Sequence, residues 1–359
     1  MTLELKNITK KLGGEVHIYE TSLTLSTGGF NVLLGNTLAG KTTLMRMMAG
    51  LEKPSSGEVW FKDKNVTGLS VQKRSAAMVY QQFINYPNFT VFENIASPLK
   101  VSGIAKAEIK NKVEQIADLL KLTSMLNRSP DELSGGQQQR TALARALVKQ
   151  AELVLLDEPL ANLDYKLREE LREELPKLFK DSGAIVVYAT TEPTEALLLA
   201  GNTITLHQGK VTQVGGAADI YHSPENLISA QVFSDPPINT SQVTKNGTQF
   251  VLHESVRWPV PEKYSYLDDG RYTLAVRPHH LTLVRGDVEE NKQVPITGTV
   301  QVAEINGSES VVHTSVHNES WVSQSRGIHD LEVGETTTMY LKTDKCFLYD
   351  LDNRLIEAR

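Results

Sequence analysis

A chain of 359 residues with 40% hydrophobic content is too long for one ordinary core and has enough apolar residues for two, so we expect two domains. Its net charge of −6 argues against nucleic-acid partners, and its single cysteine, Cys346, excludes a disulfide framework and a cysteine metal site. No signal-like N-terminus and no run near the roughly 18 apolar residues that cross a bilayer are found, which favours a cytoplasmic protein.

The first predicted elements are strands. Residues 3–8 and 16–25 show partial alternation of apolar and polar side chains, which predicts antiparallel strands of a small flanking sheet. An apolar strand over residues 31–34 follows, and then an amphipathic helix over residues 42–49 that Gly50 ends. The chain therefore turns from strand to helix between residues 35 and 43.

This connecting stretch predicts a phosphate-binding loop. Glycines let the backbone fold around a phosphate chain with its N–H groups pointing inward, and the helix N-terminus adds a partial positive charge. Lys41 is expected to reach the β- and γ-phosphates, and Thr42 to offer its hydroxyl to Mg²⁺. A plain glycine turn before a helix is the alternative. The predicted loop consists of Gly35, Asn36, Thr37, Leu38, Ala39, Gly40, Lys41, Thr42 and Thr43.

The middle of the chain alternates between strands and helices, which is typical of an α/β domain. Pro176 is expected to kink the helix over residues 164–175, and Gln208-Gly209 is expected to turn the last hairpin. In chain order the predicted elements are a hairpin arm at 59–68, a buried strand at 77–80, helices at 106–122 and after Ser134, a buried strand at 153–156, a helix at 164–175, a buried strand at 185–189, a helix at 194–200, and a hairpin of 203–207 with 210–214.

Polar side chains follow two of the predicted buried strands. Gln81 comes after the strand at 77–80, and Asp157 and Glu158 come after the strand at 153–156, at the strand ends where open α/β sheets place ligand groups. Asp157 is a good partner for Mg²⁺, and Glu158 is placed to orient or deprotonate a water that attacks a phosphoanhydride. The alternatives are that the two acids only cap a strand and that Gln81 is structural.

The composition changes after Phe233. Asp235-Pro236-Pro237 breaks the chain, and the remainder is rich in Val, Thr and Ser, with short strands predicted at 274–276, 298–303, 310–316 and 337–341. This pattern indicates a small β-barrel or sandwich. We therefore expect a first domain over residues 1–233 and a second over residues 234–359.

Five motifs stand in one order: the phosphate loop, Gln81, Ser134-Gly135-Gly136-Gln137, Asp157-Glu158 and Leu163-Asp164. This order resembles the nucleotide-binding subunits of ABC transporters over roughly residues 1–230. The C-terminal β domain and the run 276–280 narrow the likeness to carbohydrate importers of the maltose and glycerol-3-phosphate type. Within that type, the runs 37–41, 80–87 and 190–196 look most like an ATPase subunit of a bacterial glycerol importer.

The resemblance implies an α/β P-loop ATPase domain, with a mixed sheet and a helical subdomain, followed by an OB-like barrel for regulation or dimerisation. It implies ATP and Mg²⁺ as cofactors, with Glu158 and Gln81 catalytic and Thr42, Gln81 and Asp157 near the metal. Ser134, Gly135, Gly136 and Gln137 would face the ATP of a second subunit, whereas a serine cap without a ligand is the alternative. The implied partners are that second ATPase subunit, two transmembrane permease subunits at the cytoplasmic face of the membrane and, indirectly, an external solute-binding protein.

Two positions depart from the family pattern. Thr191 stands where the family usually has a histidine that contacts the γ-phosphate, so a homodimer would lack this contact in both sites. We therefore expect a heterodimer in which this chain's site is the less active half. Leu12 stands where the family often stacks an aromatic ring on adenine, and His17 or Tyr19 could take its place.

Two other functions remain open from the sequence. A regulatory subunit that binds ATP without turnover fits the loss of the histidine at Thr191. A soluble ABC-type protein that acts on nucleic acid or ribosomes would need long coiled coils or a basic insertion, and the sequence shows neither.

Overall fold

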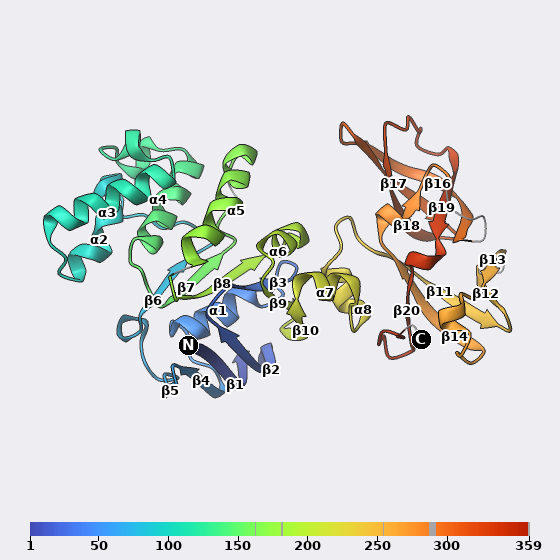
Figure 1. The fold of residues 1–359 in the computed structure, drawn as a ribbon, viewed down its shortest axis with the longest axis horizontal. Coiled ribbons are helices and arrows are strands. Elements are labelled where there is room, and N and C mark those ends of the chain that lie inside the picture. Colours follow the sequence, from blue (N-terminus) through green and yellow to red (C-terminus); the bar gives the residue numbers. More distant parts are fainter. Residues whose placement is uncertain (162, 181, 254, 287–291, 358–359) are drawn as a thin grey trace. The chain divides into compact units, whose positions relative to one another are not determined.

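The computed structural model describes residues 1–161, 163–180, 182–253, 255–286 and 292–357. By its internal contacts the chain divides into two compact units, Met1–Ala218 and Asp219–Arg359 (Figure 1). The second unit therefore begins before residue 233. It includes the short helix α8 (Leu227–Val232) and all but the first two residues of α7 (Ala217–His222). The functional limits 1–233 and 234–359 remain a prediction.

A mixed six-stranded sheet forms the centre of the first unit, as the resemblance implied. Its strand order is β10-β9-β3-β8-β7-β6, in which every pair is parallel except β9 with β10. The parallel strands therefore end at one edge, where the residues that follow them meet. The strands are β3 (Phe30–Leu34), β6 (Ala76–Val79), β7 (Leu153–Asp157), β8 (Ile185–Thr190), β9 (Asn202–His207) and β10 (Lys210–Gly216).

The predicted flanking sheet is present and has four antiparallel strands in the order β2-β1-β4-β5. Its buried side chains share one core with helix α1 (Lys41–Ala49) and with the central sheet. Gly50 ends α1 in a left-handed conformation with φ of 77°. The strands are β1 (Thr2–Leu12), β2 (Glu15–Ser26), β4 (Ser56–Phe61) and β5 (Lys64–Asn65).

Three helices, α2 (Val91–Val101), α3 (Lys106–Leu119) and α4 (Gly135–Leu147), lie together at one side of the first unit (Figure 1), and they form the helical subdomain. The sequence analysis missed α2, although Thr90 and Glu93 form a capping box at its start. Helix α5 (Tyr165–Lys180) continues through Pro176, and α6 (Pro193–Leu199) follows β8.

The second unit is an all-β domain with the two short helices at its start. Two five-stranded antiparallel sheets share one core around the fully buried Trp321 and form a nearly closed barrel, in agreement with the OB-like expectation. Their strands are β11 (Asn239–Asn246), β12 (Gln249–Leu252), β13 (Val256–Pro259), β14 (Gly270–Val276) and β20 (Phe347–Tyr349), and β15 (Leu281–Thr282), β16 (Gln293–Ile305), β17 (Glu309–Val316), β18 (Glu319–Arg326) and β19 (Thr336–Lys342). Among the described residues, no helix has the length and apolar character needed to cross a membrane.

Candidate active site

The predicted phosphate loop follows β3 and lines a pocket of about 490 Å³. Gln81 and Glu158, which follow β6 and β7, line the same pocket, so the sheet brings together three motifs that lie far apart in the sequence. The pocket is lined by Glu15, Val16, His17, Thr37, Leu38, Ala39, Gly40, Lys41, Thr42, Thr43, Gln81, Glu158, Gln208 and Gly209.

The loop requires glycine at two of its positions. A Cβ atom at Gly35 would lie 2.5 Å from the carbonyl oxygen of Leu206, in the neighbouring strand β9. Gly40 has φ of +102°, and a Cβ atom there would lie 2.7 Å from Ile18 Cδ1. Between them Leu38 is 93% exposed at the outside of the loop. The tight backbone path needed to surround a phosphate group is therefore built into the fold.

Lys41 begins α1 and is only 5% exposed. Its Nζ donates hydrogen bonds to the carbonyl oxygens of Gly35 (2.7 Å) and Asn36 (3.2 Å) and lies 3.4 Å from Glu158 Oε1. Burial lowers the pKa of Lys41, while the Glu158 carboxylate opposes that shift. The ammonium group is thus held at the base of the loop by several partners.

Thr42 and Asp157 form the part of the site suited to a hard cation. Thr42 Oγ1 donates a hydrogen bond of 2.7 Å to Oδ2 of Asp157, which ends β7 and is 1% exposed. Burial raises the pKa of Asp157, and the bond from Thr42 opposes this. Within the described ranges, no group of three or more His, Cys, Asp or Glu residues could hold a metal. One carboxylate with hydroxyl and amide oxygens still fits Mg²⁺, which takes much of its coordination from phosphates and water.

Glu158 lies between two of the other motifs. Its Oε2 accepts a hydrogen bond of 2.9 Å from Gln81 Nε2, and its Oε1 faces Lys41. Its backbone N–H donates to the carbonyl oxygen of Ala189 in β8 (3.0 Å), which fixes the residue at a positive φ of 47°. A carboxylate held in this way at the pocket is placed to accept a proton from water.

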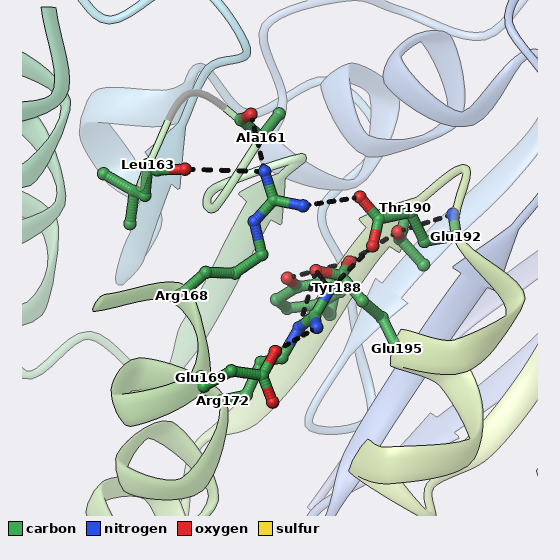
Figure 2. A network of polar contacts seen from close by, with 9 residues as sticks. All are labelled: Ala161, Leu163, Arg168, Glu169, Arg172, Tyr188, Thr190, Glu192 and Glu195. Atoms are coloured by element: carbon green, nitrogen blue, oxygen red, sulfur yellow. Dashed lines mark hydrogen bonds and ion pairs between the residues drawn. The ribbon is translucent and has the colours of Figure 1, made fainter. Parts of the chain in front are cut away.

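A polar network that the sequence analysis missed joins α5 to the end of β8 and the start of α6 (Figure 2). Arg168 of α5 donates to Glu192 (3.1 Å) and to the carbonyl oxygens of Ala161 (3.1 Å) and Leu163 (3.5 Å). Asp164, the acid of the fifth motif, accepts from the backbone N–H of Leu167 (3.0 Å) at the start of α5. The network therefore connects the segment after Glu158 with the segment after β8.

A second arginine of α5 completes this network. Arg172 contacts Glu169 (2.5 Å), Glu192 (2.6 Å) and the buried Glu195 (3.0 Å). Glu195 also accepts from Tyr188 (3.1 Å) and Thr190 (2.5 Å) in β8. Arg168 and Arg172 are four positions apart, and Glu192 and Glu195 are three positions apart, so the members of each pair point the same way. This spacing is the signal in the sequence that could have indicated the network.

Thr191 lies directly between two members of the network. Thr190 donates to Glu195, and the backbone N–H of Glu192 donates to Thr190 Oγ1 (3.0 Å). Among the described residues, the Thr191 hydroxyl takes part in no hydrogen bond and does not line the pocket. Hydrogen bonds of Thr190 and Glu192 thus hold the backbone on both sides of Thr191.

Comparisons with known proteins agree with this geometry. Residues 18–161 match the family described as ABC transporter, and residues 274–348 match the TOBE domain. The chain is 34% identical to the sn-glycerol-3-phosphate import ATP-binding protein UgpC of Pectobacterium atrosepticum, with 98% of each chain covered. It is 35% identical to the trehalose/maltose import ATP-binding protein MalK of Thermococcus litoralis, with 97% of each covered.

The chain belongs to the ABC transporter ATP-binding proteins. A solved structure of the same class, the ATP-binding cassette MJ0796 in a dimeric state bound to ADP and Pi, matches with a TM-score of 0.56 and 30% identity, covering 60% of this chain and 98% of that one. The expected enzyme class is therefore confirmed: this ABC protein is an ATPase, and its ABC domain binds ATP.

The serine-glycine motif of this ABC chain starts α4 and does not line the phosphate-loop pocket. Ser134 Oγ accepts from the backbone N–H of Gln137 (3.4 Å), and the Gln137 side chain accepts from the backbone N–H of Ser134 (3.0 Å). A Cβ atom at Gly135 would meet only Phe83 Cζ, at 4.0 Å. Packing within the chain therefore gives no reason for glycine at that position.

The three candidates for contact with adenine are placed differently. Leu12 ends β1, is 46% exposed and does not line the pocket. His17 does line it, next to Glu15 and Val16. The ring of Tyr19 is 44% exposed and lies 4.7 Å from Lys210 Nζ. The adenine contact of Leu12 remains a prediction, and His17 is the alternative nearest to the loop.

Proposed function

We propose that this chain is the ATP-hydrolysing subunit of a membrane importer for a small polyol or sugar, with glycerol as the leading candidate. The roles named for UgpC and MalK, in sn-glycerol-3-phosphate and trehalose/maltose import, support this class of solute. Two transmembrane permease subunits would hold the chain at the cytoplasmic face of the membrane, and an external binding protein would deliver the solute to them.

The observation that carries hydrolysis is the pair of contacts from Glu158 to Lys41 and to Gln81 in the phosphate-loop pocket. Lys41 would turn from the loop carbonyls to the β- and γ-phosphates, which leaves Glu158 available to a water. Gln81 would keep the Glu158 carboxylate oriented toward that water. Thr42, Asp157 and Gln81 would hold Mg²⁺, which neutralises charge on the phosphate oxygens.

We further propose that this chain pairs with a different ATPase chain. Each site would combine the phosphate loop of one chain with the serine-glycine motif of the other, and the open space at Gly135 supports close approach of such a ligand. Thr191 cannot supply the charge-assisted contact of a histidine, and loss of one preorganised donor typically costs about 10²–10³ in rate. The partner's site, completed by Ser134, would then be the fast one.

The assembled transporter tests this asymmetry. Glu→Gln at the partner's catalytic glutamate should stop ATP turnover, whereas Glu158→Gln in this chain should leave a substantial fraction. Turnover is measured by phosphate release at saturating ATP, with Glu170→Gln on the exposed face of α5 as the matched control. Equal losses from both substitutions, or full activity from a complex with two copies of this chain, would contradict the heterodimer.

The solute needs its own measurement. Uptake of labelled glycerol into proteoliposomes that contain the complete transporter should depend on ATP, and unlabelled glycerol should compete for it. Competition by maltose or sn-glycerol 3-phosphate, without competition by glycerol, would assign the importer to another member of the same solute class.

A regulatory subunit that binds ATP without turnover is the second candidate, and Thr191 is the observation that favours it. In that case Glu158→Gln would leave turnover of the assembled complex unchanged. We also propose that residues 234–359 form a dimerisation or regulatory domain. A chain that ends at Phe233 should then keep ATP binding but sediment as a weaker dimer.

A further inference from the structure

The second unit contains a pocket of about 610 Å³ that the ATPase reaction does not use. Three regions of the β domain converge on it: the turn that carries His279 and His280, the end of β18 at Arg326, and the end of β19 at Lys342. It is lined by His279, His280, Thr282, Val284, Arg285, Gly286, Glu309, Gln324, Ser325, Arg326 and Lys342.

Cations outnumber acids among the described residues that line this pocket. Within the part of the chain that the structure describes, neither Lys342 Nζ nor the Arg326 guanidinium forms an ion pair or a side-chain hydrogen bond. Arg285 lines the pocket as well, and it already has another interaction. Glu309 is the acid among the lining residues, and its Oε2 accepts a hydrogen bond of 2.6 Å from Gln324. Among the described lining residues, the charge is therefore positive.

A buried arginine beside the pocket adds to this charge. Arg277 is 2% exposed, and its guanidinium donates to the carbonyl oxygens of Phe233 (2.7 Å) and Tyr221 (2.8 Å). Carbonyl oxygens stabilise the guanidinium without cancelling its charge, and no described carboxylate pairs with it.

Burial lowers the pKa values of the two histidines of the pocket, and the nearby cations add to this effect. Burial, the neighbouring His279 and the nearby lysines and Arg277 lower the pKa of His280 to about 4. Burial, followed by Arg277 and Lys342, also lowers the pKa of His279. Both imidazoles are therefore neutral at physiological pH, and each can donate one N–H group to an anion without further charge repulsion.

We propose that this pocket binds the phosphate group of a small phosphorylated polyol or sugar. The Arg326 guanidinium and the Lys342 ammonium, which have no ion pair among the described residues, offer two positive charges for a dianion, and His279 and His280 offer neutral donors. Donors spread around a cavity suit the tetrahedral oxygens of phosphate better than one planar carboxylate. The volume exceeds that of phosphate, and all lining residues except Val284 and Gly286 have polar side chains, which leaves room for a hydroxylated remainder.

Calorimetric titration of the full-length protein tests the proposal, with glycerol 3-phosphate as the probe and glycerol as its uncharged counterpart. Glycerol 3-phosphate should bind and glycerol should not. Binding should persist in Lys41→Ala, which disables the phosphate loop as a competing anion site. Arg326→Ala and Lys342→Ala should each weaken it about tenfold or more. Arg271→Ala is the matched control, because Arg271 is exposed on β14 and lies outside the pocket.

A substitution that should strengthen binding separates a specific effect on the pocket from loss of folding. Glu309→Gln removes the negative charge of the pocket and should tighten binding severalfold, which a damaged domain cannot do. Binding that disappears in Lys41→Ala, or that is unchanged by Arg326→Ala and Lys342→Ala, would overturn the proposal. Succinate bound as tightly as glycerol 3-phosphate would overturn the phosphate class, whereas inorganic phosphate bound equally well would support it and show that the polyol adds no affinity.

Discussion

The phosphate-loop pocket and the pocket around Lys342 differ in how their charged groups are partnered. In the first, Lys41 meets Glu158 and two carbonyl oxygens, and Asp157 meets Thr42. In the second, Arg326 and Lys342 have no ion pair within the described ranges. The groups of the first pocket hold each other in place before a ligand arrives, so the proposed turn of Lys41 toward the phosphates is the main rearrangement that precedes chemistry. Unpaired cations instead suit a site whose task is to bind.

Among the substitutions that test this difference between the two pockets, Lys41→Ala should have the largest effect, and the effect should be on ATP affinity. No other cation among the lining residues of the phosphate-loop pocket can serve the β- and γ-phosphates. ATP affinity should fall at least ~100-fold, measured by calorimetry at fixed Mg²⁺. Lys64→Ala on the exposed strand β5 is the control. Near-normal ATP affinity in Lys41→Ala would show that partnered charges in this pocket are only structural.

Arg168→Ala should have an intermediate effect, on ATP turnover. It tests whether the preorganised region extends beyond the residues that line the pocket. Loss of its contacts to Glu192, Ala161 and Leu163 loosens the segments on both sides of the site. We expect turnover to fall about tenfold with little change in ATP affinity, because the arginine positions the site without touching it. Lys166→Ala, exposed on the same helix, should change neither. Equal losses of affinity and turnover would indicate general damage to the fold.

Asp157→Asn should have the smallest of the predicted effects. It should raise the thermal stability of the ligand-free chain, whereas the other substitutions lower ATP affinity or turnover. Burial raises the pKa of Asp157, so the folded chain binds its proton more tightly than the unfolded chain. Stability that depends on this group is therefore present at low pH and is lost as the pH rises through the folded pKa. Asparagine removes the buried charge and keeps an acceptor for Thr42, so the melting temperature at neutral pH should rise by a few degrees.

Thermal melts of the ligand-free protein between pH 4 and pH 8 check this expectation. The difference between Asp157→Asn and the parent chain should grow with pH. A difference that stays constant across this range would show that the Asp157 carboxylate carries no net penalty, and that the pocket is balanced by Lys41 and Thr42.

The meeting of the phosphate loop, Gln81 and Glu158 at one pocket could be predicted from sequence, because each of them adjoins the end of a strand, while their roles stay predictions. The apolar run before Asp157 fixes β7, and the parallel order of β3, β7 and β8 brings its end to the phosphate loop. Helix α2 escaped prediction because Pro98 lies inside it and interrupts the usual helical signal, although the Thr90 capping box was present. The polar network escaped because its pairs join residues about twenty positions apart.

The pocket of the β domain lay beyond sequence reasoning for a different reason. His279 and His280 are visible as a pair, but Arg326 and Lys342 reach them only through the order of the second sheet, in which β15 pairs with β19 and β18 lies at the opposite edge. Short strands of Val, Thr and Ser predict a barrel without fixing which strand ends converge. Closure of the sheet then decides the composition of the pocket.

Arg168 holds the segment before α5 through the main-chain oxygens of Ala161 and Leu163. A carbonyl oxygen is present whatever side chain its residue carries. These hydrogen bonds therefore do not depend on which side chains stand at positions 161 and 163, as long as the backbone keeps its conformation. They do depend on the arginine at position 168. Mutational scanning of the region should then show wide tolerance at the exposed Ala161, apolar residues only at Leu163, which is 6% exposed, and reduced ATP turnover for substitutions of Arg168.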